Sequence, residues 1–208
     1  MSRKIKICGM RQHDNVTQVR ALNPDYLGYI FYTKSARLFP EAEIESIVQT
    51  DSIRNTAVFV DADPAVVERI LASGKFQAVQ LHGNETPSYC RSLRSLGYET
   101  IKAFGVGQDF DYSQLEPYLD AVDFFLFDTK TPGYGGSGES FPWEILELYP
   151  HPKRYFLSGG VGPDNFQEAS QIKDERLYAI DLNSRFESSP GIKNIALLER
   201  VLKNIAYE

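Results

Sequence analysis

The chain has 208 residues, of which 42% are hydrophobic, and its 22 basic and 28 acidic residues give a net charge of −6. This length and apolar content allow one large domain or two small ones with a sizeable buried core. The acidic balance argues against nucleic acid or an anionic membrane as the main partner, and no apolar run reaches the ~18 residues that a membrane-spanning helix needs.

Short apolar runs alternate with stretches of helical periodicity along the chain. Many of the runs are apolar on both faces, as buried parallel strands are. The predicted strands are residues 5–8, 26–31, 55–60, 78–81, 100–103, 124–128, 154–158 and 178–182.

Capping residues mark several of the helices expected between these strands. Asp63 begins one helix that Gly74 ends, and Thr86 begins another that Gly97 ends. Asn194 is the expected N-cap of the last helix. Eight strands, each followed by a helix or helix-like segment, predict a single-domain α/β protein, a (β/α)₈ TIM barrel over residues 1–208. A doubly wound open sheet is the alternative, but units of about 25 residues fit closure better.

The two cysteines, Cys8 and Cys90, are too few for a disulfide framework and lack the spacing of metal ligands. The first residues lead into a strand without a long apolar signal region. We therefore expect a reduced, cytoplasmic protein.

In a barrel of this kind the active site lies at the C-terminal ends of the strands. Cys8 ends the first predicted strand and Asp128 the sixth, while Arg37 and His82 follow the second and the fourth. Cys8 is either a small buried hydrophobe or a base, and Asp128 either a structural carboxylate or an acid. A thiol with an ordinary pKa of ~8.5 needs nearby positive charge to act as a base near neutral pH. Arg37 is either a solvated charge or a clamp for a substrate carboxylate.

The last two units indicate the kind of ligand. Gly159 and Gly160 form a tight turn that runs toward a helix start, and glycines let an anion approach the backbone closely. Barrels of this type commonly bind phosphate after strands seven and eight. The residues alone thus predict an enzyme that acts on a small phosphorylated substrate by acid–base catalysis, with a glycine-rich loop at 134–138 that closes over the site.

Seven segments, in order along the chain, resemble phosphoribosylanthranilate isomerase. They are Lys6-Ile7-Cys8-Gly9-Met10, Gly28-Tyr29-Ile30-Phe31-Tyr32 with Lys34-Ser35-Ala36-Arg37, Ala57-Val58-Phe59-Val60, Val79-Gln80-Leu81-His82-Gly83-Asn84-Glu85, Phe127-Asp128-Thr129-Lys130-Thr131-Pro132 with Gly135-Gly136-Ser137-Gly138, Leu157-Ser158-Gly159-Gly160 and Pro190-Gly191-Ile192-Lys193. The resemblance implies an isomerase of tryptophan biosynthesis that carries out an Amadori rearrangement of N-(5-phosphoribosyl)anthranilate.

The resemblance also implies roles for individual residues. Asp128 takes the place of the family's general acid and Cys8 that of its general base, while Arg37 contacts the anthranilate carboxylate. The phosphate contacts fall on the backbone N–H groups of Gly159 and Gly160 and on the tip of strand eight. The predicted substrate-binding residues are Arg37, His82, Gly159, Gly160, Asp181, Asn183 and Ser184. No cofactor or metal is expected.

One segment departs from the family pattern. Where the family usually reads Asp-Val-Ser-Ser-Gly-Val-Glu, this chain reads Asp181-Leu182-Asn183-Ser184-Arg185-Phe186-Glu187. Arg185 in place of glycine either strains the turn, if that position needs a positive φ, or adds a cation beside the phosphate.

Three other functions are possible for a barrel of this kind. A metal-dependent epimerase needs converging ligands, but His82 is the only histidine expected at a strand tip. A lyase that closes an indole ring would rely on catalytic lysines, and Lys102 is one candidate, without an evident partner. A binding barrel without activity would have lost the acid or the base, and both are present. The expected partners are a small phosphorylated substrate and, in a homodimer, a second copy; a monomer is equally compatible with the sequence.

Overall fold

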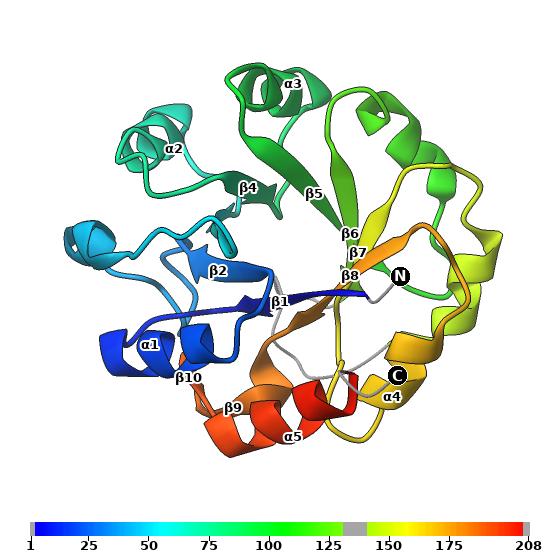
Figure 1. Ribbon diagram of the computed structural model, residues 1–208. Helices are drawn as coiled ribbons and strands as arrows, with labels where there is room; N and C mark the ends of the chain where they lie inside the picture. Colours follow the sequence, from blue (N-terminus) through cyan, green and yellow to red (C-terminus); the bar gives the residue numbers. More distant parts are fainter. Residues whose placement is uncertain (1–2, 131–140, 206–208) are drawn as a thin grey trace.

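Eight parallel strands form a closed barrel, with each strand hydrogen-bonded to the next in chain order and β8 paired with β1 (Figure 1). The computed structural model describes residues 3–130 and 141–205. The strands are β1 (Lys4–Cys8), β2 (Tyr26–Ile30), β3 (Arg54–Phe59), β4 (Ala78–Leu81), β5 (Glu99–Val106), β6 (Phe124–Thr129), β7 (Tyr155–Leu157) and β8 (Leu177–Leu182). The predicted (β/α)₈ barrel is confirmed, and the assignment of residues 1–208 to one domain stays a prediction.

Helices surround the barrel, but not every crossover is an α-helix. The α-helices are α1 (His13–Ala21), α2 (Pro64–Leu71), α3 (Pro87–Ser95), α4 (Phe166–Gln171) and α5 (Ile195–Ile205). The crossovers after β2, β5 and β6 instead contain the 3₁₀ helices η1 (Glu41–Ser46), η2 (Tyr112–Tyr118) and η3 (Trp143–Leu148). Pro117 lies inside η2 and has no N–H to donate, which disfavours an α-helix at that position.

The predicted caps are present. The Asp63 side chain accepts the Ala65 N–H at 2.8 Å, and the Asn194 side chain accepts the Leu197 N–H at 3.1 Å. No helix within residues 3–130 and 141–205 is long and apolar enough to cross a bilayer.

Alternation along the strands divides the buried side chains into two sets. One large apolar cluster fills the space between strands and helices, and a small one, which includes Leu126 and Ala179, fills the barrel interior. Two residues further along the same strands, the inward positions become acidic, at Asp128 and Asp181. The barrel therefore has an apolar floor and a polar layer above it, toward the C-terminal ends of the strands.

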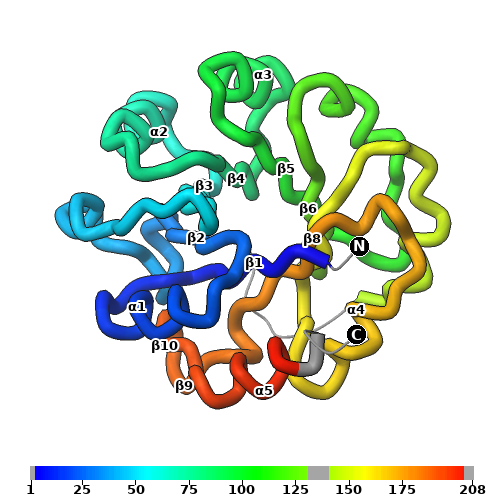
Figure 2. Tube along the Cα trace, in the orientation of Figure 1, coloured from blue at the N-terminus to red at the C-terminus, as the bar shows by residue number. Residues whose placement is uncertain are grey.

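A short antiparallel hairpin follows β8 and precedes α5, where no strand was predicted. The 3₁₀ helix η4 (Ser184–Phe186) leads into β9 (Glu187–Ser189), which pairs with β10 (Ile192–Lys193). Gly191 makes the turn with a φ of +83°, a value that glycine adopts without strain. Figure 2 shows the hairpin beside α1, where β8 has brought the chain back next to β1.

Candidate active site

Cys8 ends β1 at the polar layer and is only 4% exposed. The charged groups beside its sulfur are Lys6 on the same strand, Asp181 on β8 and Lys193 on β10. Burial raises the pKa of the Cys8 thiol, and the two lysines oppose this rise without cancelling it. A catalytic role of Cys8 as a base requires positive charge near its sulfur, and Lys6 and Lys193 provide this charge. The pKa of the thiol nevertheless lies above its ordinary value.

Glycines make room for Cys8. A Cβ atom on Gly28 of β2 would lie 2.7 Å from the Cys8 sulfur, closer than real side chains approach one another. Gly9 has a φ of +78°, and a Cβ atom there would lie 2.8 Å from both Arg37 Cδ and Asn183 Oδ1. Position 9, which follows Cys8 in the chain, and position 28, on the neighbouring strand β2, are therefore restricted to glycine.

Asp128 lies on β6, is 7% exposed, and has one close polar neighbour at each carboxylate oxygen. Its Oδ1 accepts the Thr129 N–H at 2.9 Å, and its Oδ2 lies 3.3 Å from His82 Nε2. The Gln80 amide nitrogen lies 3.1 Å from His82 Nδ1. Since an amide nitrogen only donates, Nδ1 accepts and the ring proton lies on Nε2, the ring nitrogen that is 3.3 Å from Asp128. The structure thus places His82, predicted to contact substrate, against the predicted acid.

The buried ion pair between Lys102 and Glu85 stabilises the loop that carries His82. Glu85 accepts the Gly83 N–H and lies 3.4 Å from the Lys102 ammonium, which donates to the Gly83 carbonyl at 2.7 Å. Lys102, the candidate considered for a lyase, is therefore occupied in positioning this loop.

Asp181 and Lys6 form an ion pair inside the barrel, with 2.9 Å between Oδ1 and Nζ. Burial raises the pKa of Asp181, and the Lys6 ammonium opposes that rise. Asp181 was predicted to bind substrate at the tip of strand eight, which stays a prediction; in the structure its carboxylate lies beside Lys6, with the Ser158 hydroxyl 3.4 Å away. Asp181 interacts electrostatically with both Cys8 and Asp128.

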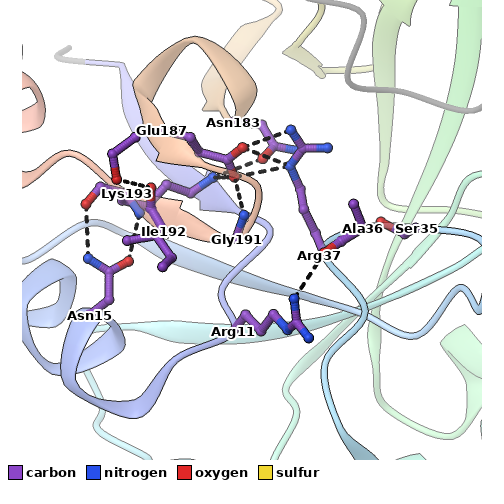
Figure 3. Close-up of polar contacts among 11 residues, drawn as sticks. Arg11, Asn15, Ser35, Ala36, Arg37, Asn183, Glu187, Gly191, Ile192 and Lys193 are labelled. Carbon is purple, nitrogen blue, oxygen red and sulfur yellow. Dashed lines mark hydrogen bonds and ion pairs between the residues drawn. The ribbon is translucent and has the colours of Figure 1, made fainter.

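Arg37, in the loop after β2, pairs with Glu187 at the start of β9 (Figure 3). Its Nε lies 3.0 Å from both Glu187 carboxylate oxygens, and its Nη2 lies 2.7 Å from Oε2. Lys193 approaches the same carboxylate at 2.7 Å and the Asn183 side-chain oxygen at 2.8 Å. Burial would favour protonated Glu187, but the hydrogen bond from Arg37 and the charge of Lys193 outweigh it and lower the pKa of this carboxyl.

Glu187 and Lys193 were not among the predicted site residues. Lys193 lies in a strand of only two residues, and Glu187 lies in a polar stretch of sequence. Both patterns are typical of a solvated surface. The available signal was the Pro190-Gly191 turn, which is typical of a chain reversal and brings residues 187 and 193 together.

The loop after β7 turns through two glycines with left-handed backbone conformations. Gly159 and Gly160 have φ values of +81° and +66°. A Cβ atom on Gly159 would lie 2.9 Å from Asp128 Oδ1 and would overlap Thr129. Neither glycine N–H has a hydrogen-bond partner among residues 3–130 and 141–205. Helix α4 begins only at Phe166, so the N–H groups nearest to β7 belong to the glycines rather than to a helix start.

Ser184 and Arg185 lie in η4, between β8 and the hairpin. Arg185 does not have a positive φ, so the expected strain is absent. Its Nη2 lies 2.6 Å from Asp164 Oδ1, and a Cβ atom on Gly162 would lie 2.9 Å from its Cδ. The Arg185 side chain lies against Gly162 in the loop after β7, and its place beside the phosphate stays a prediction. No cluster of metal ligands occurs in the described part of the chain, and loop 134–138 lies outside it.

The chain was compared with known proteins. A family model described as N-(5'phosphoribosyl)anthranilate (PRA) isomerase matches residues 5–204. The N-(5'-phosphoribosyl)anthranilate isomerase of Parabacteroides distasonis is 39% identical over 207 residues, which cover 98% of this chain and 93% of that protein.

Two solved structures are also similar. Phosphoribosyl anthranilate isomerase from Thermotoga maritima has a TM-score of 0.86 at 31% identity and covers 99% of this chain and 100% of its own. A phosphoribosyl anthranilate isomerase in complex with reduced 1-(o-carboxyphenylamino)-1-deoxyribulose 5-phosphate has a TM-score of 0.82 at 26% identity, with 99% and 100% covered.

Proposed function

Because the chain belongs to the N-(5'-phosphoribosyl)anthranilate isomerase family, and is thus an isomerase of tryptophan biosynthesis, we propose that it carries out the Amadori rearrangement with Asp128 as general acid and Cys8 as general base. The substrate is N-(5-phosphoribosyl)anthranilate and the product 1-(2-carboxyphenylamino)-1-deoxyribulose 5-phosphate. The observation that carries the proposal is the convergence of a buried carboxyl, a buried thiol and two buried lysines at the C-terminal end of one barrel.

The reaction needs two proton transfers. Asp128 donates a proton to the ring oxygen of the aminofuranose, and the ring opens to a Schiff base. Cys8 then removes the proton from C2, which gives an enolamine that tautomerises to the ketone. The Thr129 N–H fixes the orientation of the Asp128 carboxyl, and the His82 ring, 3.3 Å from Oδ2, stabilises the carboxylate left after proton donation.

The substrate's two anionic groups fit opposite sides of the site. Its carboxylate is assigned to Arg37, whose planar guanidinium suits bidentate binding. Its phosphate is assigned to the Gly159 and Gly160 N–H groups and to Ser184. A family member binds the reduced product, which carries both groups. The Asn183 side chain accepts a hydrogen bond from Lys193 on the Arg37 side, and Asn183 directly precedes Ser184 on the phosphate side.

The test is the loss of fluorescence of freshly made phosphoribosylanthranilate when the protein is added. We expect rapid loss with the unaltered chain and slow loss with the Asp128→Asn variant. Equal rates for the two proteins would contradict the assignment of Asp128. Cytoplasmic location and a monomeric or homodimeric state remain predictions.

A further inference from the structure

Glu187 binds two cations at once, and its side chain is only 4% exposed. Arg37 donates to it through Nε and Nη2, Lys193 donates through Nζ, and the Gly191 N–H lies 3.1 Å from Oε1 (Figure 3). With one negative and two positive groups, the cluster formed by Arg37, Glu187 and Lys193 retains one net positive charge.

This arrangement determines which side of Arg37 remains available. The edge formed by Nε and Nη2 is occupied by Glu187, whereas Nη1 donates to no group in the described part of the chain. A carboxylate can still bind the Nη1–Nη2 edge with two parallel hydrogen bonds. Without Glu187, the guanidinium would lose the partner that fixes its plane.

The same carboxylate influences the charge near Cys8. The Lys193 ammonium is one of three charged groups that act on the sulfur, with Lys6 and Asp181. It lies close to the residue next to Cys8, because a Cβ atom on Gly9 would be 3.5 Å from its Nζ. Burial lowers the pKa of Lys193, and the Glu187 carboxylate, 2.7 Å away, opposes that loss of the ammonium form.

We propose that Glu187 is a positioning residue that joins the two halves of the reaction: it orients Arg37 for the substrate carboxylate, and it retains the positive charge of Lys193 near Cys8. The proposal rests on the proposed function. It predicts that removal of either Glu187 or Lys193 makes the Cys8 thiol harder to ionise, whereas a merely structural loss would expose the thiol and make it easier to ionise.

The first test measures the thiol itself. The rate of alkylation of Cys8 by iodoacetamide, followed by mass spectrometry of its peptide, is recorded against pH for the unaltered chain, Glu187→Gln and Lys193→Gln. We expect the midpoint to rise by about one pH unit in both Glu187→Gln and Lys193→Gln. A midpoint that is unchanged or lower in either variant would overturn the proposal.

The second test measures binding. We expect Glu187→Gln to weaken the reduced product named above about tenfold, and to leave its counterpart without the ring carboxylate unchanged. Equal weakening of both compounds would overturn the orienting role. Glu41→Gln, which removes a surface partner of Arg69, is the matched control and should change neither measurement. If Glu187→Gln does not fold, Lys193→Gln still decides the charge effect.

These measurements do not require turnover. If Cys8→Ser retained full activity, the proposed base would be wrong, while the alkylation midpoints would still test the relationship between Glu187 and Lys193.

Discussion

The His82 imidazole places Nε2 3.3 Å from the Asp128 carboxylate. We expect His82→Leu, which removes this polar neighbour, to lower kcat by about tenfold with little change in KM. His82→Gln should retain more activity, since its amide N–H can reach a similar position. Steady-state kinetics of both variants checks this, and a kcat of His82→Leu equal to that of the unaltered chain would exclude a role of His82 in stabilising Asp128.

Removing either proposed proton-transfer group should abolish most turnover. We expect Asp128→Asn and Cys8→Ser each to lower kcat by about 10²- to 10⁴-fold, because each loses a proton transfer in the transition state. Affinity for the reduced product, measured by calorimetry, should hardly change. Near-normal turnover of either variant would refute the role of that residue.

The raised pKa of Cys8 predicts an alkaline pH dependence. A base must be deprotonated in the free enzyme, and burial keeps the Cys8 thiol protonated beyond its ordinary range. We therefore expect kcat/KM to rise as the pH increases from about 7 to 9. A flat profile over that interval would mean that Cys8 is already a thiolate or is not the base.

Arg185 offers a prediction specific to this chain, because the family usually has glycine there. Its cation lies against the loop after β7, and it is shared with the exposed Asp164. We expect Arg185→Gly to weaken inhibition by inorganic phosphate about two- to fivefold, and to reduce the sensitivity of that inhibition to salt. Unaltered inhibition would place the guanidinium outside the phosphate's reach.

Asp174 provides a test of stability away from the site. Burial opposes its ionisation, but hydrogen bonds from Arg176 and Tyr155 outweigh this and lower the pKa of Asp174. A carboxyl whose pKa is lowered on folding contributes stability above its unfolded pKa and loses that contribution as the pH falls through its folded pKa. Asp174→Asn should therefore unfold at lower urea concentration near neutral pH, and the difference should shrink below about pH 4. A difference that is constant with pH would contradict this account.

The fold was predictable from the sequence because buried parallel strands and capped helices each leave a local pattern. Local patterns were less reliable where tertiary contacts decide where a helix ends and which side chains are buried. The helix predicted between Thr86 and Gly97 ends at Ser95, and Leu96, which directly follows it, is 70% exposed.

The candidate site was predictable in part for the same reason. Cys8, Asp128 and the Gly159-Gly160 turn follow from their places at strand ends. The partners of Arg37 and Cys8 did not follow, because a buried lysine looks like a surface lysine in a sequence. Only the parallel register of β1 with β8 places Lys6 opposite Asp181, and only the hairpin places Lys193 beside Glu187.

The missing side chain at Gly28 has a consequence for how sequences of this kind can vary. Because a methyl group there would overlap the Cys8 sulfur, positions 8 and 28 are not independent. A chain that keeps the thiol must keep the glycine on the neighbouring strand, and alanine becomes acceptable at 28 only after residue 8 has become smaller. Substitutions at these two positions should therefore arise together, and in that order.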